Sequence, residues 1–223
     1  MNKKIIEDKS DADFYRRVMQ AYYILDTVRI FKKLGPAVLK LIYQNLIVGT
    51  IISQDSKKSV LSGIVMSTDL VIDGFVMGHS TVGGDDATDA ILSMYEKLDR
   101  ADISFLLISG IIISSYNMID VKRISEKIGL PVIAITHDES DGIEDAIKHH
   151  FPDSYKSKLA EYSKLGSREK ITLHTSHNLY IRNEGCTVLE AKQLLDKVTS
   201  QGSIPEPLRI AQLLANTLLK AKF

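Results

Sequence analysis

The stretch FLLISGIII, residues Phe105–Ile113, is continuously apolar apart from Ser109-Gly110 at its centre. A run of this kind is typical of a central strand that is buried on both faces of a sheet. A helical segment that stops at Gly129 and an apolar run over Val132–Thr136 follow it. Strands that are joined through a short helix pair in parallel with a right-handed crossover, so we expect the two runs to be parallel neighbours.

Three short β-rich runs precede the central stretch. They cover Leu46–Ser53, Val60–Ser67 and Val71–His79, and polar turns separate them, so we predict an antiparallel meander. A helix is expected after the turn that contains Asp85 and Asp86. Meander, helix, strand, helix, strand is the ribonuclease-H-like order. The predicted fold class is therefore α/β, with a ribonuclease-H-like mixed sheet.

The two ends of the chain carry further elements. Apolar residues recur at helical spacing from Phe14 to Val28, and Pro36 can open a second short helix through Leu41. We therefore divide the chain into a helical N-terminal extension, residues 1–45, and a ribonuclease-H-like domain, residues 46–223. Beyond the sheet core we expect a hairpin over Ile171–Arg182 and a final helix from Leu208.

Composition narrows the class of protein. The 28 basic and 28 acidic residues cancel, so net charge gives no bulk attraction to nucleic acid or to a membrane. Met1–Asn45 nevertheless holds nine basic and five acidic residues, which favours either nucleic-acid contact or, more commonly, solvated helix faces. A single cysteine, Cys186, and the absence of a signal peptide or an apolar membrane span predict a cytoplasmic protein.

The turn before the first sheet helix is the first candidate site. Asp85 and Asp86 are adjacent carboxylates that could bind Mg²⁺, with the helix amides free to meet a phosphate. The alternative is that one aspartate caps the helix and the glycines before it only make the turn.

The other candidates are more dispersed. Two prolines bracket Glu206, which predicts either a pre-organised site acid or a buried pair with Arg209. Ser109 lacks the sharp turn of a hydrolase nucleophile, and His137 follows a strand end, where either a catalytic dyad or a simple turn is possible. No histidine has metal-ligand spacing with the cysteine, so no zinc site is predicted.

A resemblance to a known family rests on specific segments. The chain resembles the archaeal family called domain of unknown function ninety-nine, which is related to endonuclease V and has a ribonuclease-H-like fold. The resemblance covers about Leu46 to the end. It is carried by Gly83–Thr88, Leu107–Asp120, Gly129–Val132 and Gly202–Ala211, with GSIPEPLRIA as the strongest signature.

The departures from that family pattern carry the functional expectation. The pattern has aspartates where this chain has about Thr50–Ser53, Gly83 and Ser109, and a histidine where it has Gln212. The residues that match are Asp86, Thr88, Asn117, Glu206 and Arg209. Metal-dependent cleavage needs several carboxylates around a divalent cation, so the resemblance implies the fold without this activity.

We therefore predict a catalytically inactive relative that binds single-stranded or structured nucleic acid, with no cofactor beyond a weak Mg²⁺ site. The alternative is a small-molecule hydrolase or transferase that uses Asp86, His137 and Glu206. In either case the fold order predicts one crevice. The residues expected to converge there are Asp86, Thr88, Ser109, Asn117, Glu206 and Arg209.

Overall fold

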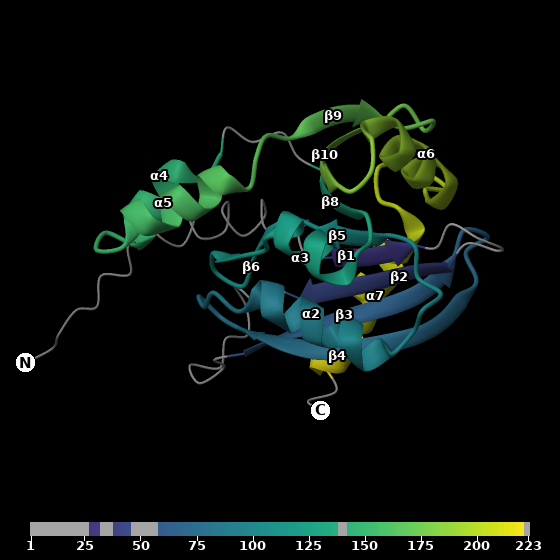
Figure 1. The fold of residues 1–223 in the computed structure, drawn as a ribbon, viewed down its shortest axis with the longest axis horizontal. Helices are drawn as coiled ribbons and strands as arrows, with labels where there is room; N and C mark the ends of the chain where they lie inside the picture. The colour runs from purple at the N-terminus through teal and green to yellow at the C-terminus, as the bar shows by residue number, and fades with distance from the viewer. Residues whose placement is uncertain (1–26, 32–37, 46–57, 138–141, 221–223) are drawn as a thin grey trace, which may run out of the picture.

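A mixed eight-stranded sheet forms the centre of the computed structural model, which describes residues 27–31, 38–45, 58–137 and 142–220 (Figure 1). The strand order is β4-β3-β2-β1-β5-β8-β10-β9. The strands of this sheet are β1 (Thr27–Phe31), β2 (Val38–Asn45), β3 (Lys58–Ser67), β4 (Ile72–Thr81), β5 (Leu106–Ser109), β8 (Val132–Thr136), β9 (Glu169–Thr172) and β10 (Asn178–Glu184). Strands β1 to β4 form an antiparallel meander, β5 and β8 are parallel, and β10 is antiparallel to both β8 and β9.

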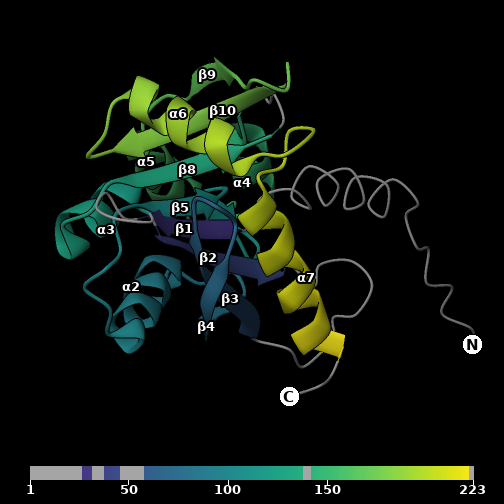
Figure 2. The same cartoon turned by 90° about the vertical axis from the view of Figure 1, so that its right-hand side faces the viewer.

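Helices cover both faces of the sheet. On one side, the α2 face, lie α2 (Ala87–Leu98), α3 (Val121–Ile128), α4 (Glu144–His150) and α5 (Tyr155–Lys164). On the other side, the α7 face, lie α6 (Val188–Val198) and α7 (Glu206–Lys220). Figure 2 shows α2 and α7 on opposite sides of the sheet.

Alternation along the central strands fills both cores. Leu106 and Ile108 of β5 belong to the α2-face core, whereas Leu107 belongs to the α7-face core. All three are fully buried, as are the residues of β8 beside them. The continuous apolar runs of the sequence therefore have the cause that was expected, which is burial on both sides of a parallel pair.

The helix prediction for the N-terminal region is wrong where the structure describes it. Thr27–Phe31 and Val38–Asn45 are strands, and they pair with each other and with the central sheet. Both segments are rich in β-branched and aromatic residues, and pairing with β3 and β5 decides their conformation over any helical spacing. The start of the predicted first helix at Phe14 lies outside the described residues.

The meander prediction is confirmed for its second and third strands, as β3 and β4. Leu46–Ser53, the predicted first strand, lies outside the described residues, and β2 is the strand that pairs with β3. The predicted strand Phe105–Ile113 is interrupted at Gly110, which has a φ of 71°. After this break, β6 (Ile112–Ile113) pairs with β7 (Asn117–Met118) in a separate two-stranded sheet.

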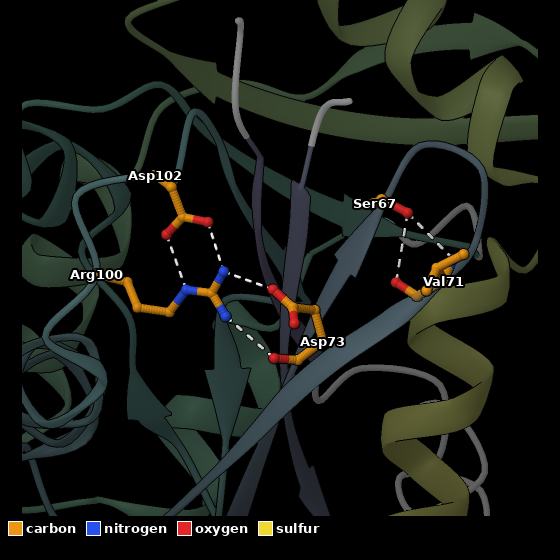
Figure 3. Close-up of polar contacts among 5 residues, drawn as sticks. All are labelled: Ser67, Val71, Asp73, Arg100 and Asp102. Carbon is orange, nitrogen blue, oxygen red and sulfur yellow. Dashed lines mark hydrogen bonds and ion pairs between the residues drawn. The ribbon is translucent and has the colours of Figure 1, made fainter. Parts of the chain in front are cut away.

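Polar contacts fix the turn end of the β3–β4 hairpin. Arg100, just beyond α2, donates from Nε to Asp102 at 2.8 Å and from Nη1 to the backbone carbonyl of Asp73 at 3.0 Å (Figure 3). The backbone N–H of Val71 donates to the Ser67 hydroxyl at 3.1 Å across the turn. The Arg100 contacts fix the end of α2 to the edge strand β4.

No helix within the described ranges is long and apolar enough to cross a membrane.

Candidate functional site

The carboxylate of Asp86 lies between the end of β4 and the start of α2, and protein donors surround it. Its Oδ1 accepts hydrogen bonds from the backbone N–H of Thr81 at 2.9 Å and from the side-chain amide of Asn117 at 2.7 Å. Its Oδ2 accepts the Thr81 hydroxyl at 2.6 Å. Partial burial alone raises the pKa of this carboxyl, but the bonds from Thr81 and Asn117 outweigh it and the pKa falls below its usual value.

Asn117 joins three segments at this point. Its Oδ1 accepts the backbone N–H of Ala87 at 2.9 Å, and its Nδ2 donates both to Asp86 and to the carbonyl of Thr81 at 2.9 Å. Asp86 occupies the N-cap position without a side-chain cap bond of its own. The prediction that Asp85 or Asp86 caps α2 is therefore wrong, because an asparagine from β7 supplies the acceptor.

Thr88 extends the same network to the next helix. Its hydroxyl accepts the backbone N–H of Asp120 at 2.9 Å, and Asp120 in turn caps α3 by accepting the N–H of Arg123. Asp86, Thr88 and Asn117, three of the six residues that were expected to converge, are thus brought together. Their shared effect is to hold the starts of α2 and α3 against the β6–β7 hairpin.

The β6–β7 hairpin reverses through a left-handed turn. Ser114, Ser115 and Tyr116 have φ values of 42°, 59° and 70°, a conformation that side chains with a Cβ adopt at a cost. The hydroxyl of buried Ser114 is hydrogen-bonded to that of Ser59, and its carbonyl accepts the N–H of Gly83 at 2.6 Å. This turn places Asn117 under the start of α2.

Asp85 has a partner that the sequence did not reveal. Lys158 of α5 donates to it at 2.9 Å, and the same ammonium lies 4.9 Å from the centre of the Phe151 ring. The Lys158 side chain is 10% exposed, whereas that of Asp85 is 72% exposed. A lysine in an alternating polar helix gives no signal of burial, so only the structure shows that it anchors α5 to this turn.

Aromatic side chains connect the surroundings of Lys158 with the β6–β7 turn. The Tyr116 ring lies 5.2 Å from Phe151 in an edge-on arrangement and 5.4 Å from His150. Burial lowers the pKa of His150, and the neighbouring His149 lowers it further. His150 is therefore biased towards its neutral form.

The remaining predicted residues lie elsewhere. Glu206 and Arg209 form a pair within the first turn of α7, with 2.8 Å between Arg209 Nε and Glu206 Oε2. Ser109 is buried in β5 and shares the α7 face with Leu107 by strand alternation. His137 follows the end of β8.

The predicted single crevice is therefore not formed. Asp86 lies at the start of α2 and Glu206 at the start of α7, and the central sheet separates the two helices (Figure 2). Of the two interpretations of Glu206, the structure favours the pair with Arg209, because the Glu206 side chain is 12% exposed and its carboxylate is paired with the Arg209 guanidinium.

Comparison with known proteins shows the family to which the chain belongs. A family model described as Endonuclease dU matches residues 49–219. The chain belongs to the Endonuclease dU family. A UPF0215 protein of Pyrobaculum calidifontis is 31% identical over 159 residues, covering 71% of this chain and 87% of the relative. A UPF0215 protein of Thermococcus kodakarensis is 29% identical over 165 residues, covering 73% and 83% respectively.

Solved structures show the same fold. A protein of unknown function from Archaeoglobus fulgidus aligns with a TM-score of 0.66 and 22% identity over 85% of this chain and 97% of that one. Endonuclease V of Ciona intestinalis, in complex with an inosine-containing 24mer DNA, aligns with a TM-score of 0.51 and 11% identity over 97% of this chain and all of that one. The α/β architecture of this Endonuclease dU family member is thus endonuclease V-like.

Metal binding can be tested on the side chains of this Endonuclease dU family member. In the part of the chain that the structure describes, no group of three or more His, Cys, Asp or Glu residues is placed to hold a metal ion. The two carboxylates nearest the start of α2 are engaged, Asp86 by Thr81 and Asn117, and Asp85 by Lys158.

Proposed function

We propose that this member of the Endonuclease dU family binds uracil-containing DNA and does not cleave it by a metal-dependent mechanism. The nucleic-acid part of the proposal is supported by the family description and by the endonuclease V fold, of which one solved example holds an inosine-containing DNA. Both point to DNA that carries a deaminated base.

The observation that carries the second part is the state of Asp86. A carboxylate that ligates Mg²⁺ must present at least one oxygen to the cation. Both oxygens of Asp86 instead accept bonds from Thr81, and one also accepts the amide of Asn117. Moving this carboxylate to a metal would break the contacts that hold the start of α2.

The second carboxylate of the turn supports the same conclusion. Asp85 neutralises the nearly buried ammonium of Lys158, so its recruitment by a cation would leave that charge without its carboxylate. Ser109 and Gly83 stand where the family pattern described above has aspartates. A two-metal cleavage site holds its two cations about 4 Å apart by means of carboxylates that bridge them, and these positions supply none.

Metal-dependent cleavage at deoxyuridine is the second candidate, and the family description is the observation in its favour. The small-molecule alternative has no such support. It required Asp86, His137 and Glu206 in one crevice, and Asp86 and Glu206 lie on opposite sides of the sheet.

The test uses two single-stranded oligonucleotides that differ only in one uracil or thymine base. Binding of the full-length protein is measured by fluorescence anisotropy in EDTA, at several salt concentrations. We expect binding that weakens steeply with salt, since phosphate contacts release counterions, and competition in which the uracil strand is the better ligand. Equal competition by both strands, or no binding at low salt, overturns the proposal.

A further inference from the structure

A cavity of about 330 Å³ lies at the edge of the sheet, on the side away from β4. It exists because β10 extends beyond β9. Residues 178–181 of β10 pair with β9, whereas Arg182, Asn183 and Glu184 pair only with β8. The turn after α5 and the first residues of α3 form the other walls. The volume is at the lower end of the range that small ligands occupy, roughly 300–1,000 Å³.

Arg182 is a partly buried cation in the wall of this cavity. Its Nε donates to the carbonyl of Gly166 at 3.0 Å, and its other contacts in the described ranges are with Tyr162 and with the charge of Arg168. Burial lowers the pKa of Arg182, and the neighbouring Arg168 lowers it further. No described carboxylate forms an ion pair with it, which is uncommon for a guanidinium withdrawn from water.

Further cations gather around the same place. Lys164 and Lys122 line the cavity with Arg182. Arg168 and Lys170 both lie over the ring of Tyr180, at 5.3 Å and 5.7 Å from its centre. We call this group of cations the basic surface, and it consists of Lys122, Lys164, Arg168, Lys170 and Arg182.

Acidic residues also line the cavity, and their positions matter. The Asp120 carboxylate accepts the N–H of Arg123 within α3. Glu169 is the cross-strand partner of Ile181, so both side chains face the α7 side of the sheet. The side chain of Arg182, the next residue along β10, faces the other side. Glu184 shares the face of Arg182 but lies two residues, roughly 7 Å, further along the strand. None of the three neutralises Arg182 at ion-pair distance in the described ranges.

We propose that the cavity binds a phosphate group of the DNA backbone through Arg182 and Lys164, and that Arg168 and Lys170 continue the interface along the β9–β10 hairpin. The inference rests on the proposed function and names the surface that performs it. A guanidinium is suited to this ligand because it donates two parallel hydrogen bonds to phosphate oxygens. The Tyr180 ring beside the cations offers an apolar surface to the adjoining sugar or base.

The experiment compares Arg182→Gln and Lys170→Gln with the matched control Lys97→Gln, an exposed lysine on α2. Binding to the uracil-containing single strand is measured from 50 to 300 mM salt, a range of about sixfold. We expect each of the two site variants to weaken binding about tenfold and to reduce the salt slope by about 0.7, with Lys97→Gln unchanged.

Two further measurements separate a failure of this interface from misfolding and from a failure of the proposed function. Arg182→Gln is checked for folding by circular dichroism, and Lys170→Gln provides the same test at an exposed position. Unchanged affinity and slope in both variants, with a wild type that binds, overturns the interface while the proposed function stands. If the wild type binds no DNA, the phosphate site is tested on its own, by measuring whether pyrophosphate raises the thermal unfolding temperature of the protein. A stabilisation that Arg182→Gln abolishes supports the phosphate site, and no stabilisation of the wild type overturns it.

Discussion

Asn117 caps α2 by accepting the backbone N–H of Ala87, a residue 30 positions earlier in the chain, at 2.9 Å. Asn117 is fully buried, and its amide nitrogen is shared between Asp86 and the carbonyl of Thr81. One side chain thus satisfies a helix N-terminus, a strand end and a carboxylate. This amide therefore links the three segments that meet at the site.

Replacement of Asn117 by alanine should lower the free energy of unfolding by about 2–3 kcal/mol, because the helix cap is lost and buried polar groups lose their partner. The measurement is urea denaturation at pH 7. Asn178→Ala, in an exposed position on β10, removes a single hydrogen bond with Thr172 and is the control. A loss at Asn117 no larger than that at Asn178 would contradict the described role.

Stability should depend on pH through Asp86. Its folded pKa lies below the ordinary 3.8, so the charged form stabilises the fold above about pH 4, and this contribution is lost as the pH falls through the folded value. Asp86→Asn should cost about 1 kcal/mol at pH 7. The difference in unfolding free energy between wild type and variant should shrink as the pH is lowered towards 3, and a difference independent of pH would rule out this account.

The Asp85–Lys158 pair should respond asymmetrically to mutation. Asp85→Ala leaves the Lys158 ammonium nearly buried beside Phe151 without its carboxylate, and should cost about 1 kcal/mol. Lys158→Met keeps the apolar stem and removes the charge, so it should cost less than Asp85→Ala. Thermal or urea unfolding of both variants gives the comparison. A larger loss for Lys158→Met would mean that the lysine contributes mainly by its charge.

The left-handed turn should discriminate between side chains at Ser115, whose φ is 59°. Ser115→Val should lower the free energy of unfolding by about 1–2 kcal/mol, because a β-branched residue is strained in this conformation. Ser115→Gly should be close to neutral, since relief of strain offsets the greater freedom of the unfolded chain. Equal stability of the two variants would show that the turn relaxes.

The sequence was informative where local pattern and tertiary context agree. Continuous apolar runs predicted β5 and β8, and Gly129 marked the end of α3, where it has a φ of 67°. The structure also has a capping box at Thr187, which depends on the same kind of local contact. These elements depend on burial and on caps that a few neighbouring residues define.

The sequence was less informative where distant pairing decides the conformation. The strands β1 and β2 were predicted as helices, because apolar residues at helical spacing and at strand spacing overlap in short segments. Within the site, the sequence singled out Asp86 and Asn117 but did not show that they bond to each other. Lys158 was missed, since its burial depends on contacts 73 residues away.

The most direct test of the account measures binding and cleavage in one sample. The full-length protein is mixed with end-labelled uracil-containing single-stranded DNA in 5 mM Mg²⁺ or Mn²⁺, concentrations of the order of millimolar that fill weak oxygen-ligand sites. Bound fraction and strand length are followed together. The account predicts a bound strand that stays intact with either metal, at an affinity no higher than that found in EDTA, because the divalent cation competes for the phosphates. Metal-dependent cleavage beside the uracil, absent in EDTA, would contradict it.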